Sequence, residues 1–135
     1  MNYTMNKDHM IMLVDDDTIH NFITEHFLKD NYPPVQVVSF TNPEEAFKHV
    51  SSIPENRELT FPEIIFLDIN MPLMNGWEFL DEYIKADLHH IAPSKIYILS
   101  SSLDPNDISK AQRYPVVSGF ISKPLTPDKV NDIIK

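Results

Sequence analysis

The stretch LVDDDTIH, residues 13–20, places three consecutive carboxylates directly behind the apolar run of residues 10–14. The run has the length and composition of a buried strand, so the acids stand where that strand is predicted to end. Aspartate is a preferred helix cap, and one of the three can serve simply to start a helix. Three carboxylates close together also repel one another unless a positive group offsets them. The stretch therefore indicates a helix start, a cation site, or both.

The composition of the chain limits the classes of function that it can have. Its 135 residues suit one domain, which we expect to span residues 1–135, with a core at about 9–135 and an N-terminal extension at 1–8. A formal net charge of −9 disfavours nucleic acid and anionic membranes as direct partners. The absence of cysteine excludes thiolate metal sites and cysteine nucleophiles. Without a membrane-spanning apolar run or a signal peptide, the chain is predicted to be cytoplasmic.

Short apolar blocks alternate with amphipathic stretches along the chain, which is the pattern of strand–helix units around a parallel sheet. The five blocks are residues 10–14, 35–40, 64–67, 96–99 and 116–121. Most of them are continuously apolar, as strands buried on both faces are. The pattern therefore predicts an α/β fold that is doubly wound, with a five-stranded parallel sheet and helices on both faces.

The stretches between these blocks carry helix signals. Proline follows a capping residue at Asn42-Pro43 and at Thr126-Pro127, which places it at the first helical position. In the first helix the apolar side chains that share one face are Ile19, Phe22, Ile23 and Phe27. In a helix predicted from about residue 77 to 88 the inward-facing side chains are Trp77, Leu80, Tyr83 and Ile84. A thinner pattern predicts a helix near residues 104–113, and the polar residues 51–58 predict a loop.

Polar side chains follow four of the five predicted strands. They are Asp15, Asp16 and Asp17 after the first, Asp68 and Asn70 after the third, Ser100, Ser101 and Ser102 after the fourth, and Ser122 and Lys123, followed by Pro124, after the fifth. Ligands of an open parallel sheet bind beyond the carboxyl ends of its strands. Magnesium prefers such oxygen ligands and is commonly shared with a phosphate, whose remaining oxygens a lysine and a hydroxyl can bind. The edge is thus predicted to be a magnesium and phosphate site, to which magnesium is better suited than zinc.

Four stretches, MLVDDDTIH, IIFLDINMPLMNGWEFL, ILSSS and GFISKPL, together resemble the response-regulator receiver domain of two-component signalling. The resemblance spans nearly the whole chain. It implies a flavodoxin-like sheet with strand order 2-1-3-4-5 and a stand-alone, chemotaxis-regulator-like phosphoprotein. Such a protein takes a phosphoryl group from a phosphohistidine donor and then switches a protein-binding surface. It is not an enzyme beyond catalysing its own phosphorylation and autodephosphorylation.

The same resemblance implies a role for each motif residue. Asp68 is the phosphoacceptor, and Mg2+ is held by Asp15, Asp16, Asp68 and the backbone carbonyl of Asn70. Lys123 contacts the phosphoryl group, and Ser100 and Phe120 are the switch residues. Asn70 and Ser102 tune hydrolysis. Asp17 is left to cap the helix, Pro124 follows Lys123 through an expected cis bond, and Gly76 is a turn glycine in a conformation that other residues resist.

The implied partners are a sensor histidine kinase or a histidine phosphotransfer protein, and a downstream protein that binds the face formed by helix four, strand five and helix five. Neither nucleic acid nor a membrane is an expected partner. Chemotaxis-like output and an intermediate step in a phosphorelay both stay open. The six histidines show no metal-ligand spacing with carboxylates on one helix face, and we assign them no chemistry.

Two alternatives remain at this point. MLVDDDTI also loosely resembles the first motif of haloacid-dehalogenase phosphohydrolases, with Asp15 as nucleophile and Asp17 as acid/base. The chain is short for that fold, and no later acidic pair follows a strand near its end. A pseudo-receiver that acts only as a binding module is disfavoured by the complete set of motif positions.

Overall fold

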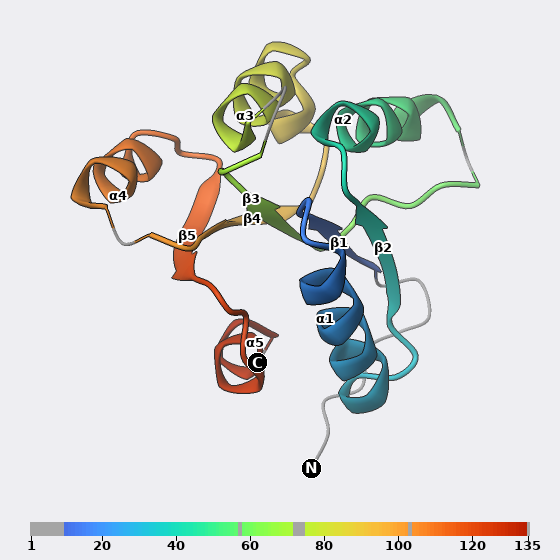
Figure 1. The fold of residues 1–135 in the computed structure, drawn as a ribbon. Helices are drawn as coiled ribbons and strands as arrows, with labels where there is room; N and C mark the ends of the chain where they lie inside the picture. Colours follow the sequence, from blue (N-terminus) through green and yellow to red (C-terminus); the bar gives the residue numbers. More distant parts are fainter. Residues whose placement is uncertain (1–9, 57, 72–74, 103, 135) are drawn as a thin grey trace.

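The computed structural model describes residues 10–56, 58–71, 75–102 and 104–134, so the expected extension at 1–8 lies outside the described residues. Five parallel strands form one sheet in the order β2-β1-β3-β4-β5 (Figure 1). The strands are β1 (Met10–Val14), β2 (Gln36–Phe40), β3 (Ile64–Asp68), β4 (Lys95–Ser100) and β5 (Val117–Ser122). Each predicted block therefore begins and ends within one residue of a strand, and the predicted fold class and strand order are confirmed.

Helices cover both faces of this sheet. They are α1 (Thr18–Asn31), α2 (Pro43–Ser52), α3 (Gly76–Lys85), α4 (Pro105–Gln112) and α5 (Pro127–Ile134), with short 3-10 turns η1 (Ile53–Glu55) and η2 (Leu88–His90). In Figure 1, α1 and α5 lie on one face, and α2, α3 and α4 lie on the other. Among the described residues, no helix is both long and apolar enough to cross a membrane.

Local capping explains where most helices begin. Asp17, Asn42, Asn75 and Asp104 each accept a backbone hydrogen bond as the N-cap of α1, α2, α3 and α4. Pro43 and Pro127 open their helices as predicted. Two expected boundaries are wrong. The predicted loop at 51–58 contains the end of α2 and η1, and α3 ends at Lys85 rather than near 88, because Asp87 adopts a left-handed conformation with φ of 63°.

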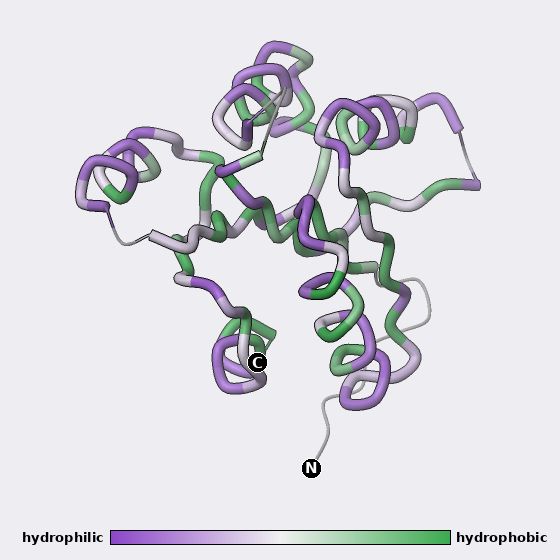
Figure 2. The backbone as a smooth tube through the Cα atoms, viewed as in Figure 1, coloured by the Kyte–Doolittle hydropathy of each residue, from purple (hydrophilic) through white to green (hydrophobic). Residues whose placement is uncertain are grey.

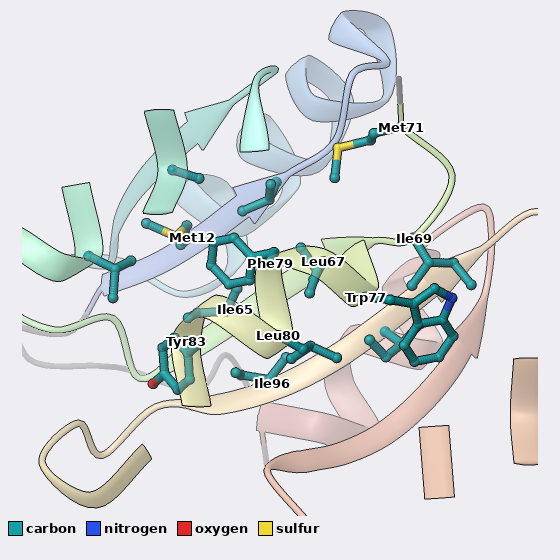
Figure 3. Packing of buried hydrophobic residues seen from close by; sticks show 14 of the residues in the cluster. Met12, Ile65, Leu67, Ile69, Met71, Trp77, Phe79, Leu80, Tyr83 and Ile96 are labelled. Carbon is teal, nitrogen blue, oxygen red and sulfur yellow. The ribbon is translucent and has the colours of Figure 1, made fainter. Parts of the chain in front are cut away.

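The larger core cluster lies between the sheet and the helices α2, α3 and α4 (Figure 3). Trp77, Leu80 and Tyr83 of α3 are buried there as predicted, and Ile84 is half-buried. Figure 2 shows that hydrophobic positions concentrate in the central strands, whereas hydrophobic and hydrophilic positions alternate along the helices. The strands thus form the apolar centre against which amphipathic helices pack.

Of the four apolar side chains predicted to share one face of α1, Phe27 is half-buried against the smaller core cluster, but the other three do not pack inward. Ile19, Phe22 and Ile23 are 71%, 64% and 62% exposed, although a face of this kind usually packs on a core. The residues that α1 buries are Asn21, Thr24 and Leu28, which follow the i, i+3, i+7 spacing of a helix. Asn21 decides this rotation, because its Nδ2 donates to the backbone oxygen of Asp15 over 2.8 Å. A polar anchor at the end of β1 therefore accompanies the outward position of Ile19, Phe22 and Ile23.

Candidate functional site

Three acids meet at the carboxyl edge of the sheet, as the sequence predicts. Val14 of β1 pairs with Leu67 of β3, so Asp15, directly after β1, and Asp68, the last residue of β3, lie side by side at one level. Asp15, Asp16 and Asp68 each place an oxygen atom within 4.8 Å of the others. Asp15 and Asp68 are 1% and 2% exposed, whereas Asp16 is exposed. The edge therefore has two buried carboxylates and one that faces solvent.

Both carboxylate oxygens of Asp15 have partners. Oδ1 accepts a hydrogen bond of 2.9 Å from the backbone N–H of Asp17. Oδ2 lies 2.9 Å from Lys123 Nζ and 3.2 Å from His20 Nδ1. Burial alone raises the pKa of a carboxyl group, but the contacts with His20, Lys123 and Asp17 outweigh it and lower the pKa of Asp15 to about 2. Asp15 is therefore a firmly ionised group.

Asp68 is less well compensated. Its Oδ1 accepts a 2.9 Å hydrogen bond from the backbone N–H of Asn70, and its Oδ2 lies 3.5 Å from Lys123 Nζ. Burial, together with the negative charge of Asp15, raises the pKa of Asp68 to about 6 in spite of these two contacts. The ionised form of Asp68 is therefore destabilised, and a nearby cation would stabilise it.

Lys123 reaches the acids from the end of β5 and, with Asp15, Asp16 and Asp68, forms the acid pocket. Its backbone N–H donates to the oxygen of Ser100 over 2.8 Å, which holds the residue beside β4. Burial lowers the pKa of a lysine, but the two aspartates outweigh this and raise the pKa of Lys123, so the ammonium group stays charged. The bond between Lys123 and Pro124 is cis, as expected.

Ser100 lies fully buried beside Asp68 and Asn70. Its Oγ accepts hydrogen bonds from the backbone N–H of Ser102 at 3.1 Å and from Asn70 Nδ2 at 3.4 Å. Asn70 and Ser102 are themselves exposed, at the solvent side of the pocket. Phe120 in β5 lies further away, half-buried against the larger core cluster.

Gly76 has a role different from the one expected. It opens α3 and does not have the positive φ that would favour glycine. A Cβ atom at this position would lie 2.7 Å from the backbone oxygen of Asp68 and 2.8 Å from Ile69 Cα. Glycine is therefore required by the close approach of α3 to the end of β3, and the expectation of an unusual backbone conformation is wrong.

Sequence reasoning missed His20 as a member of this site. Its ring contacts Asp15, and its Nε2 accepts a 3.1 Å hydrogen bond from the backbone N–H of Leu125. The signal available was its position in the first turn of a helix that starts directly after the acids.

Sequence spacing also did not predict a second group of possible metal ligands. Asp87, His89 and His90 bring ligand atoms within 4.8 Å of one another. These three precede β4, at the opposite edge of the sheet, and are separate from the acid pocket.

The donor set suits a hard cation and a phosphoryl group. Carboxylate oxygens at this separation match the ligands that Mg2+ prefers, and the described residues of the pocket offer no sulfur ligand. The phosphohydrolase alternative fails on geometry. Asp17, its acid/base, is the N-cap of α1 and accepts from the backbone N–H of His20 at 3.0 Å.

The fold and the site together define a doubly wound α/β protein whose acid pocket and lysine can hold a cation and a phosphoryl group. The response regulator receiver domain family matches residues 11–135, and the chain belongs to this family. It is therefore a receiver domain of two-component signalling. Receiver domains are in general phosphoacceptor switches rather than enzymes.

Individual relatives agree with this assignment. A two-component response regulator from Cytophaga hutchinsonii has a crystal structure that is similar, with a TM-score of 0.77, 31% identity, and coverage of 99% of this chain and 96% of that one. Chemotaxis protein CheY-3 of Vibrio cholerae is 28% identical over 93% of this chain and 88% of its own length. A protein-glutamate methylesterase/protein-glutamine glutaminase of Myxococcus xanthus is 30% identical over 86% of this chain, which spans 30% of that protein.

Proposed function

We propose that Asp68 accepts a phosphoryl group from a phosphohistidine on a sensor histidine kinase or a histidine phosphotransfer protein. The observation that carries this proposal is the charge balance of the pocket, in which Lys123 Nζ lies 2.9 Å from Asp15 but 3.5 Å from Asp68. Attack by a carboxylate oxygen of Asp68 forms a P–O bond and breaks the P–N bond of the donor, whose imidazole keeps the electron pair. The product is an acyl phosphate stored on the domain.

The proposed Mg2+ ligands are Asp16, Asp68 and the backbone carbonyl of Asn70, with Asp15 acting mainly through a water molecule. The indirect role of Asp15 is supported by its two oxygens, which already contact Asp17, Lys123 and His20. The chemistry that bound Mg2+ supplies is neutralisation of negative charge on the carboxylates and the phosphoryl oxygens. Lys123 lies between the two buried acids and can contact a phosphoryl oxygen on Asp68.

The proposed switch consists of Ser100 and Phe120. The two hydrogen bonds of Ser100 Oγ use it as an acceptor, so its hydroxyl hydrogen can donate to a phosphoryl group on Asp68. Phe120 borders a groove of about 220 Å3 between α4 and β5, next to Ile108 and Ala111. Inward movement of Phe120 would reshape the face formed by α4, β5 and α5, where the downstream protein is proposed to bind. Chemotaxis-like and phosphorelay outputs both remain compatible, and the expected cytoplasmic location stays a prediction.

The exposed apolar face of α1 supports a protein as the donor. Ile19, Phe22 and Ile23 follow the acids directly in sequence and are more than 60% exposed. Phe22 also borders a groove of about 220 Å3 with Thr18 and Thr41. Exposed apolar side chains beside a charged site are typical of protein contact surfaces, and this one would hold the phosphohistidine of a donor next to Asp68.

The test is intact-protein mass spectrometry after mixing with candidate phosphohistidine donors and Mg2+. We expect one phosphoryl group on the parent, lost in acid and base, and none on Asp68→Asn. Asp17→Asn is the matched control, because asparagine caps a helix as well as aspartate does, the side chain of Asp17 serves as the N-cap, and its backbone N–H to Asp15 is kept. Stoichiometric labelling of Asp68→Asn, with the label on Asp15, would instead support phosphohydrolase chemistry.

A further inference from the structure

His20 joins the acid pocket to the connection between β5 and α5. It lies in the first turn of α1, where its backbone N–H donates to Asp17 Oδ1. Its side chain is 14% exposed, with Nδ1 at 3.2 Å from Asp15 Oδ2. Its Nε2 lies 3.1 Å from the backbone nitrogen of Leu125, which is 105 residues further along the chain. One imidazole therefore bridges an acid at the end of β1 and the backbone that precedes α5.

The two contacts determine where the ring carries its hydrogen. A backbone N–H can only donate, so His20 Nε2 accepts from Leu125 and has no hydrogen of its own. The neutral ring then has its hydrogen on Nδ1, which faces Asp15 Oδ2 at 3.2 Å. Both the tautomer and the rotation of the ring are thereby set from two sides. A ring held in this way also holds the carboxylate of Asp15 in one orientation.

Leu125 is a firm anchor for this bridge. Its side chain is 8% exposed and belongs to the core cluster that includes Leu28 and Val130. It follows Lys123 and Pro124, so the same short segment reaches Asp15 Oδ2 twice, through Lys123 Nζ and through the ring of His20. A change in the position or charge of Asp15 is therefore expected to change the environment of the Leu125 backbone N–H through the ring of His20.

We infer that His20 is a positioning residue, which orients Asp15 for cation binding and transmits cation binding to Leu125 at the start of the connection to α5. The inference rests on the proposed magnesium role of the acid pocket. His20 reaches the acids through Asp15 Oδ2, so its effect on the cation passes through Asp15. The β5–α5 connection thus responds to the metal as well as to Lys123.

The experiment is a Mg2+ titration of the full chain, labelled with 15N and followed by NMR. In the parent, we expect the Leu125 amide signal to shift with the same midpoint as the signals of the acid pocket. His20→Phe keeps a ring but can make neither contact, so we expect Mg2+ affinity about 10-fold weaker and no Leu125 shift. His20→Asn keeps a donor near Asp15 but does not reach Leu125, so affinity should stay near the parental value while the Leu125 shift disappears.

The matched control is His26→Phe, on the same helix, because His26 is exposed and packs against Phe22 rather than the pocket. It should change neither readout. Parental affinity in His20→Phe, or a parental Leu125 shift in His20→Asn, would overturn the role of His20 and leave the proposed function intact. A parent that binds no Mg2+ would overturn both. The imidazole 15N shifts of the metal-free parent add an independent check, since a hydrogen on Nε2 instead of Nδ1 contradicts the bridge.

Discussion

The ends of β1 and β3 carry buried aspartates that their surroundings affect in opposite ways. Asp15 and Asp68 are 1% and 2% exposed and stand at the ends of two neighbouring strands. The pKa of Asp15 is nevertheless lowered to about 2, and the pKa of Asp68 is raised to about 6. Burial is the largest influence on both and raises the pKa in each case. The partners therefore decide the sign.

The difference shows how two identical side chains acquire different roles. The charge of Asp15 is balanced by the ammonium group of Lys123, by the nearby ring of His20 and by a hydrogen bond from the backbone N–H of Asp17, so Asp15 acts as a fixed anion. Asp68 has one backbone hydrogen bond and a more distant ammonium group. It therefore has more to gain from a cation, or from conversion into an acyl phosphate. Four predictions test this contrast.

The largest effect is expected when the lysine between the two acids is removed. Lys123→Met leaves Asp15 buried without its 2.9 Å partner, and loss of one member of a buried ion pair costs about 3 kcal/mol. Urea denaturation in EDTA at pH 7 should show the free energy of unfolding falling by about this amount. Lys48→Met, at an exposed position of α2, should change it by less than about 0.5 kcal/mol. If Asp15→Asn does not recover part of the loss in a double variant, the pair is not its cause.

The next effect concerns the cation that is proposed to relieve Asp68. Asp16→Ala removes the exposed carboxylate of the cluster, so Mg2+ affinity measured by calorimetry should weaken about 10-fold, or about 1.4 kcal/mol. Asp17→Asn should bind Mg2+ as the parent does. Unchanged affinity in Asp16→Ala would remove Asp16 from the ligand set.

Stability of the metal-free protein should depend on pH with opposite signs for the two acids. Because the folded pKa of Asp68 is raised to about 6, the native state binds more protons than the unfolded state between about pH 4 and 6, and stability falls as pH rises through this window. The stability that Asp15 contributes is present above pH 4 and is lost as pH falls toward its folded pKa of about 2.

Substitution of Asp68 isolates its part of this dependence. Asp68→Asn should stabilise the metal-free protein relative to the parent by about 1 kcal/mol at pH 7, with allowance for solvent screening at the open edge. The gain should shrink toward pH 4, as followed by urea denaturation in EDTA. A gain that is the same at both pH values would show that the charge of Asp68 is not responsible.

The smallest effect concerns the lifetime of the acyl phosphate. Asn70 and Ser102 flank the solvent side of Asp68, and neither is a strong base, so we expect slow to intermediate hydrolysis. Asn70→Leu should lengthen the lifetime about threefold by hindering the approach of water, while phosphorylation is retained. This corresponds to an increase of less than about 1 kcal/mol in the activation free energy of hydrolysis. The phosphoprotein fraction is followed over time at fixed Mg2+. Parental rates in both Asn70→Leu and Ser102→Leu would show that water access is controlled elsewhere.

Much of the fold could be predicted because its signals are local. Continuous apolar runs mark strands buried on both faces, and Asp17 and Pro43 mark helix starts through hydrogen bonds within a few residues. The face of α1 could not be predicted in this way. Its apolar spacing resembles that of α3, but Asn21 contacts Asp15, and this tertiary hydrogen bond outweighs the burial of Phe22 and Ile23.

The sequence by itself determined which residues stand at the carboxyl edge, because parallel strands end at one edge and each motif directly follows its strand. It placed Asp15, Asp16, Asp68, Ser100 and Lys123 in one pocket. Only the tertiary structure decided how the two buried aspartates differ and that His20 belongs with them. Lys123 lies 55 residues beyond Asp68, and Leu125 lies 105 beyond His20. The electrostatic balance depends on distances between groups that are far apart in sequence, such as the 2.9 Å from Lys123 Nζ to Asp15 and the 3.5 Å to Asp68. Spacing along the chain does not encode these distances.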